Sequence, residues 1–147
     1  MIGPDDPILL DMLRKHEDER MFAYDDETGM TVKCDGSARL TIGVGRNLQD
    51  NGLTKDEITY LLMNDTRRAY AEAVQFHWFE ELSDNRQRVV VDMLFNLGRK
   101  RFGTFVKMIA ALERQDFQNA VHEMMNSKWR QQVKTRADTL MEMMRQG

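Results

Sequence analysis

The sequence predicts an α+β protein whose strands lie near the N-terminus and whose remaining elements are helices. Three observations favour this class: an amphipathic helix opens the chain, two β-prone runs around an Asp-Gly turn follow it, and everything after residue 83 has helical periodicity. The expected order is a first helix, a small β-hairpin lobe, a long connecting helix and a mainly helical C-terminal lobe.

Length and composition fit one domain, 1–147, that can bury a sizeable core. No apolar run reaches the roughly 20 residues of a membrane span, so no stable membrane insertion is expected. The first residues lack the basic and apolar regions of a secretory signal, which predicts folding in a cytoplasm. Cys34 is the only cysteine and the three histidines lack ligand spacing, so neither a metal nor a disulfide is expected.

Charge is unevenly distributed. Acids outnumber bases in residues 1–65, and bases outnumber acids in residues 66–147. A basic half indicates a polyanionic partner or a cleft lined by unlike charges, and a chance imbalance on solvated helices is the plainer alternative. No nucleic-acid partner is expected, because the chain has no recognition motif for one and its pI is about 5.6.

A first helix is predicted over about residues 6–22. Asp5 or Asp6 can cap it, and Pro7 suits its first position. One sector of its helical wheel should face the interior, and it holds Leu10, Leu13, Glu17 and Met21.

Two acids near this helix have the chemistry of a glycosidase. A carboxyl group against apolar surface, as expected for Glu17, keeps its proton more readily and suits a general acid. Asp26 lies in a polar turn, where a carboxylate stays ionised. Two acids with different environments beside one cleft are the parts of a glycoside hydrolase. A charged helix face followed by a polar loop is the structural alternative.

The runs 30–34 and 38–42 flank Asp35-Gly36-Ser37 and predict a hairpin within a lobe of about residues 24–53. Gly43-Val44-Gly45 follows and would let the backbone approach something closely. These glycines do not match a dinucleotide-binding fingerprint.

A capping box, Thr54 to Glu57, opens the connecting helix of about residues 54–78. The helical lobe, about 83–147, should pack with the first helix. Its expected boundaries are a cap at Ser83 or Asp84, a stop at Gly98, caps at Thr104 and Asp116, and a last helix from about Trp129 to Met144.

The order of helix acid, turn acid and hairpin threonine resembles the phage lysozymes (endolysins) of the T-even type, the muramidases of glycoside hydrolase family 24. Glu17 ends Met12-Leu13-Arg14-Lys15-His16-Glu17, Asp26 follows after eight residues, and Thr41 stands in Leu40-Thr41-Ile42-Gly43-Val44-Gly45. Later segments are also similar to the family: Met93-Leu94-Phe95-Asn96-Leu97-Gly98, Ser127-Lys128-Trp129 and Thr135-Arg136-Ala137.

This resemblance implies a lysozyme-like fold that hydrolyses the β-1,4 bond between N-acetylmuramic acid and N-acetylglucosamine in bacterial peptidoglycan. Glu17 would protonate the leaving oxygen, and Asp26 and Thr41 would hold the attacking water, with inversion at the anomeric carbon. Carboxyl groups about 6.5–9.5 Å apart are needed for that geometry. The resemblance also implies a monomer without a cofactor that stays in the host cytoplasm until it is released to the wall.

Two further residues receive supporting roles from the resemblance. Arg136 would lie beside Glu17 and hold it by a charge-assisted hydrogen bond, or else be a surface arginine that covers apolar area. Asn96 would touch a sugar, or else cap a helix end.

The chain departs from the family pattern in two places. Fourteen residues separate Asp26 from Thr41, a longer interval than usual, so Thr31 is a rival for the role of the threonine. Arg46 stands where the family tends to have a histidine.

A non-catalytic domain of the same fold, which binds wall glycan or serves in a virion, is the alternative function. The sequence leaves hydrolase and lytic transglycosylase open.

Overall fold

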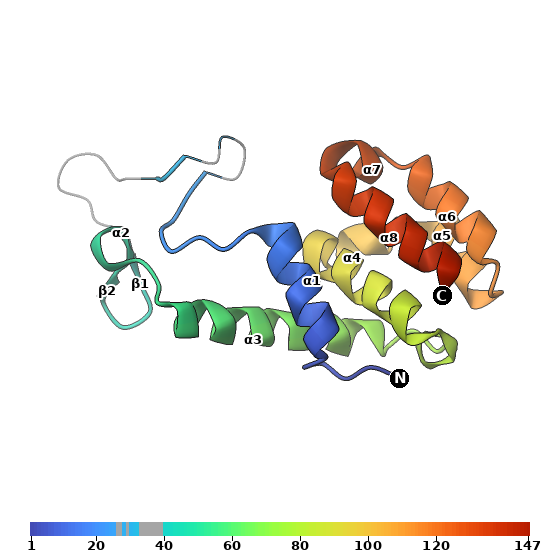
Figure 1. Cartoon of the computed structure of the whole chain (residues 1–147), viewed down its shortest axis with the longest axis horizontal. Coiled ribbons are helices and arrows are strands. Elements are labelled where there is room, and N and C mark those ends of the chain that lie inside the picture. Colours follow the sequence, from blue (N-terminus) through green and yellow to red (C-terminus); the bar gives the residue numbers. More distant parts are fainter. Residues whose placement is uncertain (26–27, 29, 33–39) are drawn as a thin grey trace. The chain divides into compact units, whose positions relative to one another are not determined.

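The computed structural model describes residues 1–25, 28, 30–32 and 40–147. Contacts divide these residues into two compact units. We call residues 1–16 and 63–147 the helical unit and residues 17–62 the small unit. The described residues are mostly helical and include a small antiparallel sheet (Figure 1), which agrees with the predicted class and is consistent with a lysozyme-like fold.

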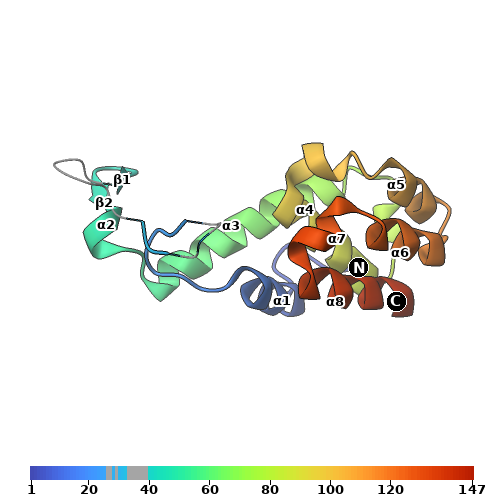
Figure 2. The same cartoon turned by 90° about the horizontal axis from the view of Figure 1, so that it is seen from above.

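The helical unit is built around α4 (Asp84–Phe102), in which every residue from Gln87 to Leu94 is buried. The helix α8 (Thr135–Gln146) packs against α4, as Figures 1 and 2 show. The remaining elements are η1 (Phe79–Glu81), α5 (Val106–Glu113), α6 (Phe117–Met125) and α7 (Lys128–Val133). Two helices have residues in both units: α1 (Pro7–Glu17) and α3 (Lys55–Ala73).

The core of the helical unit is apolar and includes several methionines. An unbranched thioether side chain fills irregular gaps between helices, which explains their use here. The largest fully buried apolar side chains are Leu9, Leu13, Phe79, Met93, Leu94, Phe102, Met108, Leu112, Met124, Leu140 and Met144. Among the described residues, no helix combines the length and the apolar character needed to cross a bilayer.

The first helix is shorter than predicted. It ends at Glu17 because Asp18 has a positive φ of 62°, a conformation that aspartate tolerates better than most residues. The prediction of which side chains of this segment face the interior is also wrong in part. Leu9 and Leu13 are buried, whereas Met21, now beyond the helix, is 47% exposed.

The local caps are confirmed where a side chain can reach a free backbone amide. Asp6 accepts a hydrogen bond from the Leu9 amide, and Ser83 and Asp116 accept from the amides three residues on. Thr54 and Glu57 form the predicted capping box, with reciprocal hydrogen bonds of 2.8 and 3.3 Å.

Other boundaries differ from the prediction. The helix α3 ends at Ala73 rather than near residue 78, and Thr104 does not cap α5, because its hydroxyl donates to the Arg101 carbonyl instead. Gly98 leaves the helical conformation, but α4 resumes and runs on to Phe102.

The single helix expected from Trp129 to Met144 is two helices, α7 and α8. Lys134 separates them with a φ of 38° and a ψ of −105°, which are not helical values, although its amide still donates to the Arg130 carbonyl oxygen.

In the small unit, β1 (Thr41–Ile42) pairs antiparallel with β2 (Arg46–Asn47), and α2 (Leu48–Asn51) follows. The Gly43-Val44-Gly45 segment is the turn of this hairpin. Both glycines have positive φ, which suits a tight hairpin turn, and no described atom lies within 4 Å of a Cβ built on either.

The predicted hairpin across Asp35-Gly36-Ser37 lies outside the described residues. Within them, an isolated antiparallel bridge joins Tyr24 to Thr31.

Stability should depend on pH through the start of α1. Both carboxylate oxygens of Asp6 accept from Arg88, at 2.8 and 3.0 Å. This hydrogen bonding holds the pKa of Asp6 below its usual value of 3.8. A carboxyl group whose pKa is lowered by folding stabilises the fold above its unfolded pKa, and that contribution disappears as pH falls through the folded pKa.

We therefore expect Asp6→Asn, which keeps the helix cap, to lower the free energy of unfolding at pH 7 but not in acid below the folded pKa. Urea unfolding of both proteins at a series of pH values from 7 downward measures this. A loss that is the same at every pH would contradict the assignment.

Candidate active site

The predicted acid Glu17 is the last residue of α1, and its side chain is half-buried. The predicted threonine, Thr41, is exposed on β1, and its rival Thr31 is exposed as well. Asp26 lies outside the described residues. Glu17 and Thr41 both belong to the small unit, and Asn96 and Arg136 belong to the helical unit. The roles of these residues therefore stay predictions.

Arg46 serves the local structure of the small unit. Its Nε and Nη2 atoms donate to the Gly52 carbonyl oxygen at 3.1 and 2.7 Å, and Nη1 donates to Glu57. Because Glu57 also completes the capping box of α3, Arg46 ties the hairpin to the start of that helix. Gly52 has a φ of 58°, and a Cβ there would lie 2.5 Å from the Met21 carbonyl oxygen, so this corner requires glycine.

A buried cluster of charged side chains lies at the end of α1, beside Glu17 in sequence. Asp92, on α4, is fully buried. Its Oδ1 accepts from Nε of Arg136 at 2.8 Å, and its Oδ2 accepts from Nδ1 of His16 at 2.9 Å. Arg136 and His16, the residue before Glu17, therefore bind the same carboxylate. Because Arg136 is buried, the alternative of a surface arginine is wrong.

Asn96 does not cap a helix end. Its side-chain oxygen accepts from the indole nitrogen of Trp129 at 3.0 Å, which fixes the orientation of that ring. Trp129 also packs edge-on against Phe105, with 6.3 Å between ring centroids. Asn96 therefore supports a wall of the neighbouring pocket.

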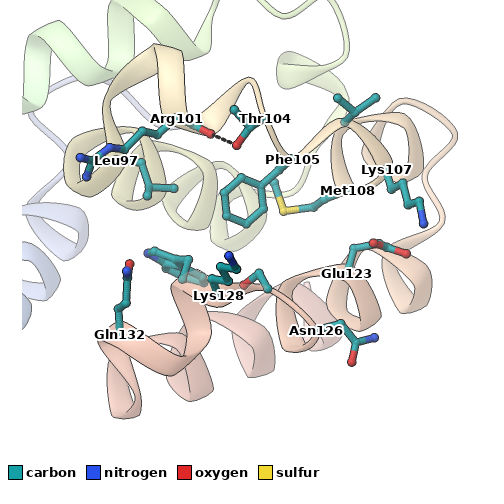
Figure 3. A pocket seen from close by; sticks show the side chains of 13 residues that line it. Leu97, Arg101, Thr104, Phe105, Lys107, Met108, Glu123, Asn126, Lys128 and Gln132 are labelled. Carbon is teal, nitrogen blue, oxygen red and sulfur yellow. Dashed lines mark hydrogen bonds between the residues drawn. The ribbon is translucent and has the colours of Figure 1, made fainter.

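This pocket, which we call the α5–α7 pocket, lies wholly in the helical unit between the end of α4, α5 and the α6–α7 segment. Its volume is about 720 Å³. Figure 3 shows Phe105 and Met108 on one side and Lys128 opposite them. Arg101, Lys107 and Lys128 give it three cations against one acid, Glu123. The α5–α7 pocket can therefore accept a ligand that has both apolar and anionic groups.

A metal centre would need at least three suitable side chains in one place. Within the described ranges, no group of histidine, cysteine, aspartate or glutamate side chains has that arrangement.

A family model described as phage lysozyme matches residues 14–145. Because the match covers most of the chain, the protein belongs to the phage lysozyme family, whose members are glycosidases that hydrolyse peptidoglycan. No curated protein matches the chain.

Two features of the site were missed from the sequence. Asp92 was detectable, because it is the one charged residue in the apolar run from Val89 to Leu94. For the α5–α7 pocket, the only indication in the sequence was the excess of basic residues in the C-terminal half. Its cations come from three separate segments, so no local motif identifies them.

Proposed function

We propose that this protein is a muramidase of glycoside hydrolase family 24, similar to the T-even lysozymes, which cleaves the β-1,4 bond between N-acetylmuramic acid and N-acetylglucosamine. Glu17 donates a proton to the leaving oxygen, and Asp26 and Thr41 position the attacking water, so that the anomeric carbon is inverted. A hydroxyl suits the last role because it can donate and accept a hydrogen bond at once.

The observation that carries this proposal is the match of the phage lysozyme model to residues 14–145. Arg136 supports the proposal through its contacts. It was assigned from the family pattern to the neighbourhood of Glu17, and it binds the same buried carboxylate as His16, the residue before Glu17. We propose that Arg136 is the cation that stabilises the Glu17 carboxylate once the proton has been given up.

The α5–α7 pocket fits the substrate as well. Peptidoglycan carries short peptides with free carboxylates beside apolar side chains, and Lys107 and Lys128 provide the complementary charge. We propose that this pocket binds such a peptide and adds to substrate affinity.

Mass spectrometry of the products from purified peptidoglycan tests the reaction. Reducing muramic acid ends are expected. Anhydro ends would identify a lytic transglycosylase, and no release of fragments would refute the activity.

The same assay on glycan stripped of its peptides tests the α5–α7 pocket. The wild type should cleave intact peptidoglycan faster than the stripped glycan, and Lys107→Glu should reduce that preference. An unchanged preference would remove the peptide from the proposal.

A further inference from the structure

Asp92 is a buried carboxylate to which the proposed reaction gives no role. Burying a carboxylate is unfavourable unless it is paired and hydrogen-bonded, and here each oxygen has a cationic or polar partner of its own. The two partners come from α1 and α8, so a single side chain on α4 connects three helices.

The hydrogen bonds also fix the state of His16. A carboxylate only accepts hydrogen bonds, so Nδ1 of His16 must carry a proton, and Nε2 is directed away from Asp92. The His16 side chain is 12% exposed. His16 and Arg136 line a pocket of about 390 Å³ together with Lys15, Lys134 and Thr135, so their outer faces are accessible while Asp92 lies behind them.

The end of α1 needs such an anchor. Because Asp18 leaves the helical conformation, no further helical turn follows Glu17 to hold its backbone in place. The neighbouring side chain of His16 is fixed to the buried core through Asp92.

We propose that Asp92 is a positioning residue for Glu17: by holding His16, the residue bonded to Glu17 in the chain, it fixes the end of α1 and with it the direction in which the Glu17 side chain leaves the helix. This rests on the proposed function for its catalytic consequence. The structural claim, that Asp92 fixes the end of α1, stands on the geometry alone.

Asp92→Asn is the sharpest test, because it keeps the size of the side chain. The amide oxygen can still accept from Arg136, but the amide nitrogen now donates to His16, so the proton of His16 moves from Nδ1 to Nε2. Nitrogen-15 NMR of the histidine ring should report this change of tautomer, and the Glu17 side-chain resonances should shift.

On solubilised wall fragments, kcat of Asp92→Asn should fall by about tenfold or more while KM changes by less than about twofold, because misplacing a catalytic group reduces the rate rather than binding.

Asp6→Asn is the matched control. It removes the negative charge of Asp6, which binds Arg88 of α4. Asp6 precedes the first residue of α1, about 16 Å from Glu17 along the helix axis. It should lower the melting temperature without changing kcat or the Glu17 resonances.

Two substitutions of His16 keep the proposal testable if the Asp92→Asn protein does not fold. His16→Gln can still donate to Asp92 and should retain more activity than His16→Ala. Equal activities of this pair would overturn the positioning role. So would a folded Asp92→Asn protein with wild-type kcat, or one whose Glu17 resonances match those of Asp6→Asn. If the wild type cleaves no peptidoglycan, the proposed function fails, and the NMR comparison still decides whether Asp92 fixes the end of α1.

Discussion

Glu17→Gln should abolish the release of reducing ends from peptidoglycan while leaving the fold intact. Glutamine has the shape of glutamic acid, but its amide cannot deliver a proton to the leaving oxygen. Loss of a general acid costs about 10²–10⁴-fold in rate, so we expect kcat to fall within or beyond that range. Release of reducing sugar from purified peptidoglycan measures the rate, and circular dichroism checks the fold.

Glu19→Gln is the control for this change. Glu19 is an exposed acid two residues further along the chain, outside α1, and the substitution is chemically the same. It should retain the wild-type rate. A Glu17→Gln protein that degrades peptidoglycan as fast as the wild type would end the assignment of the general acid.

Arg136→Met should cause the largest loss of stability. Asp92 would remain buried with its negative charge and only His16 as a partner. Removing one member of a buried ion pair costs about 3–5 kcal/mol, because the remaining charge is left uncompensated in a medium of low polarity. Urea unfolding at pH 7 measures the change in the free energy of unfolding.

Two further variants separate this explanation from a simple loss of packing. Arg130→Met removes an arginine whose partner, Asp138, is half exposed, and it should cost less than about 1 kcal/mol. The double variant Arg136→Met, Asp92→Leu replaces the pair by apolar groups and should recover part of the stability. A double variant that is less stable than Arg136→Met would contradict the buried-charge explanation.

Much of the fold follows from local rules. The caps at Asp6, Ser83 and Asp116 depend on a side chain and an amide three residues away, so the sequence alone predicts them. The helical character of the C-terminal half follows from its apolar periodicity in the same way.

The features that were missed depend on partners distant in sequence. The buried partner of Arg136, Asp92, is 44 residues away in sequence and on another helix. The end of α1 was placed too late because the apolar pattern continues to Met21, while the conformation of Asp18 ends the helix first. Neither fact is encoded in a window of neighbouring residues.

The junction between α7 and α8 has a consequence for protein engineering. At Lys134 the backbone combines a φ of 38° with a ψ of −105°, a region that side chains with a Cβ atom avoid at a cost of about 1–3 kcal/mol. Glycine adopts such dihedral angles freely, so this corner offers a route to a more heat-resistant enzyme. Since Lys134 also borders the pocket formed by His16 and Arg136, any gain in thermal tolerance has to be weighed against catalytic speed.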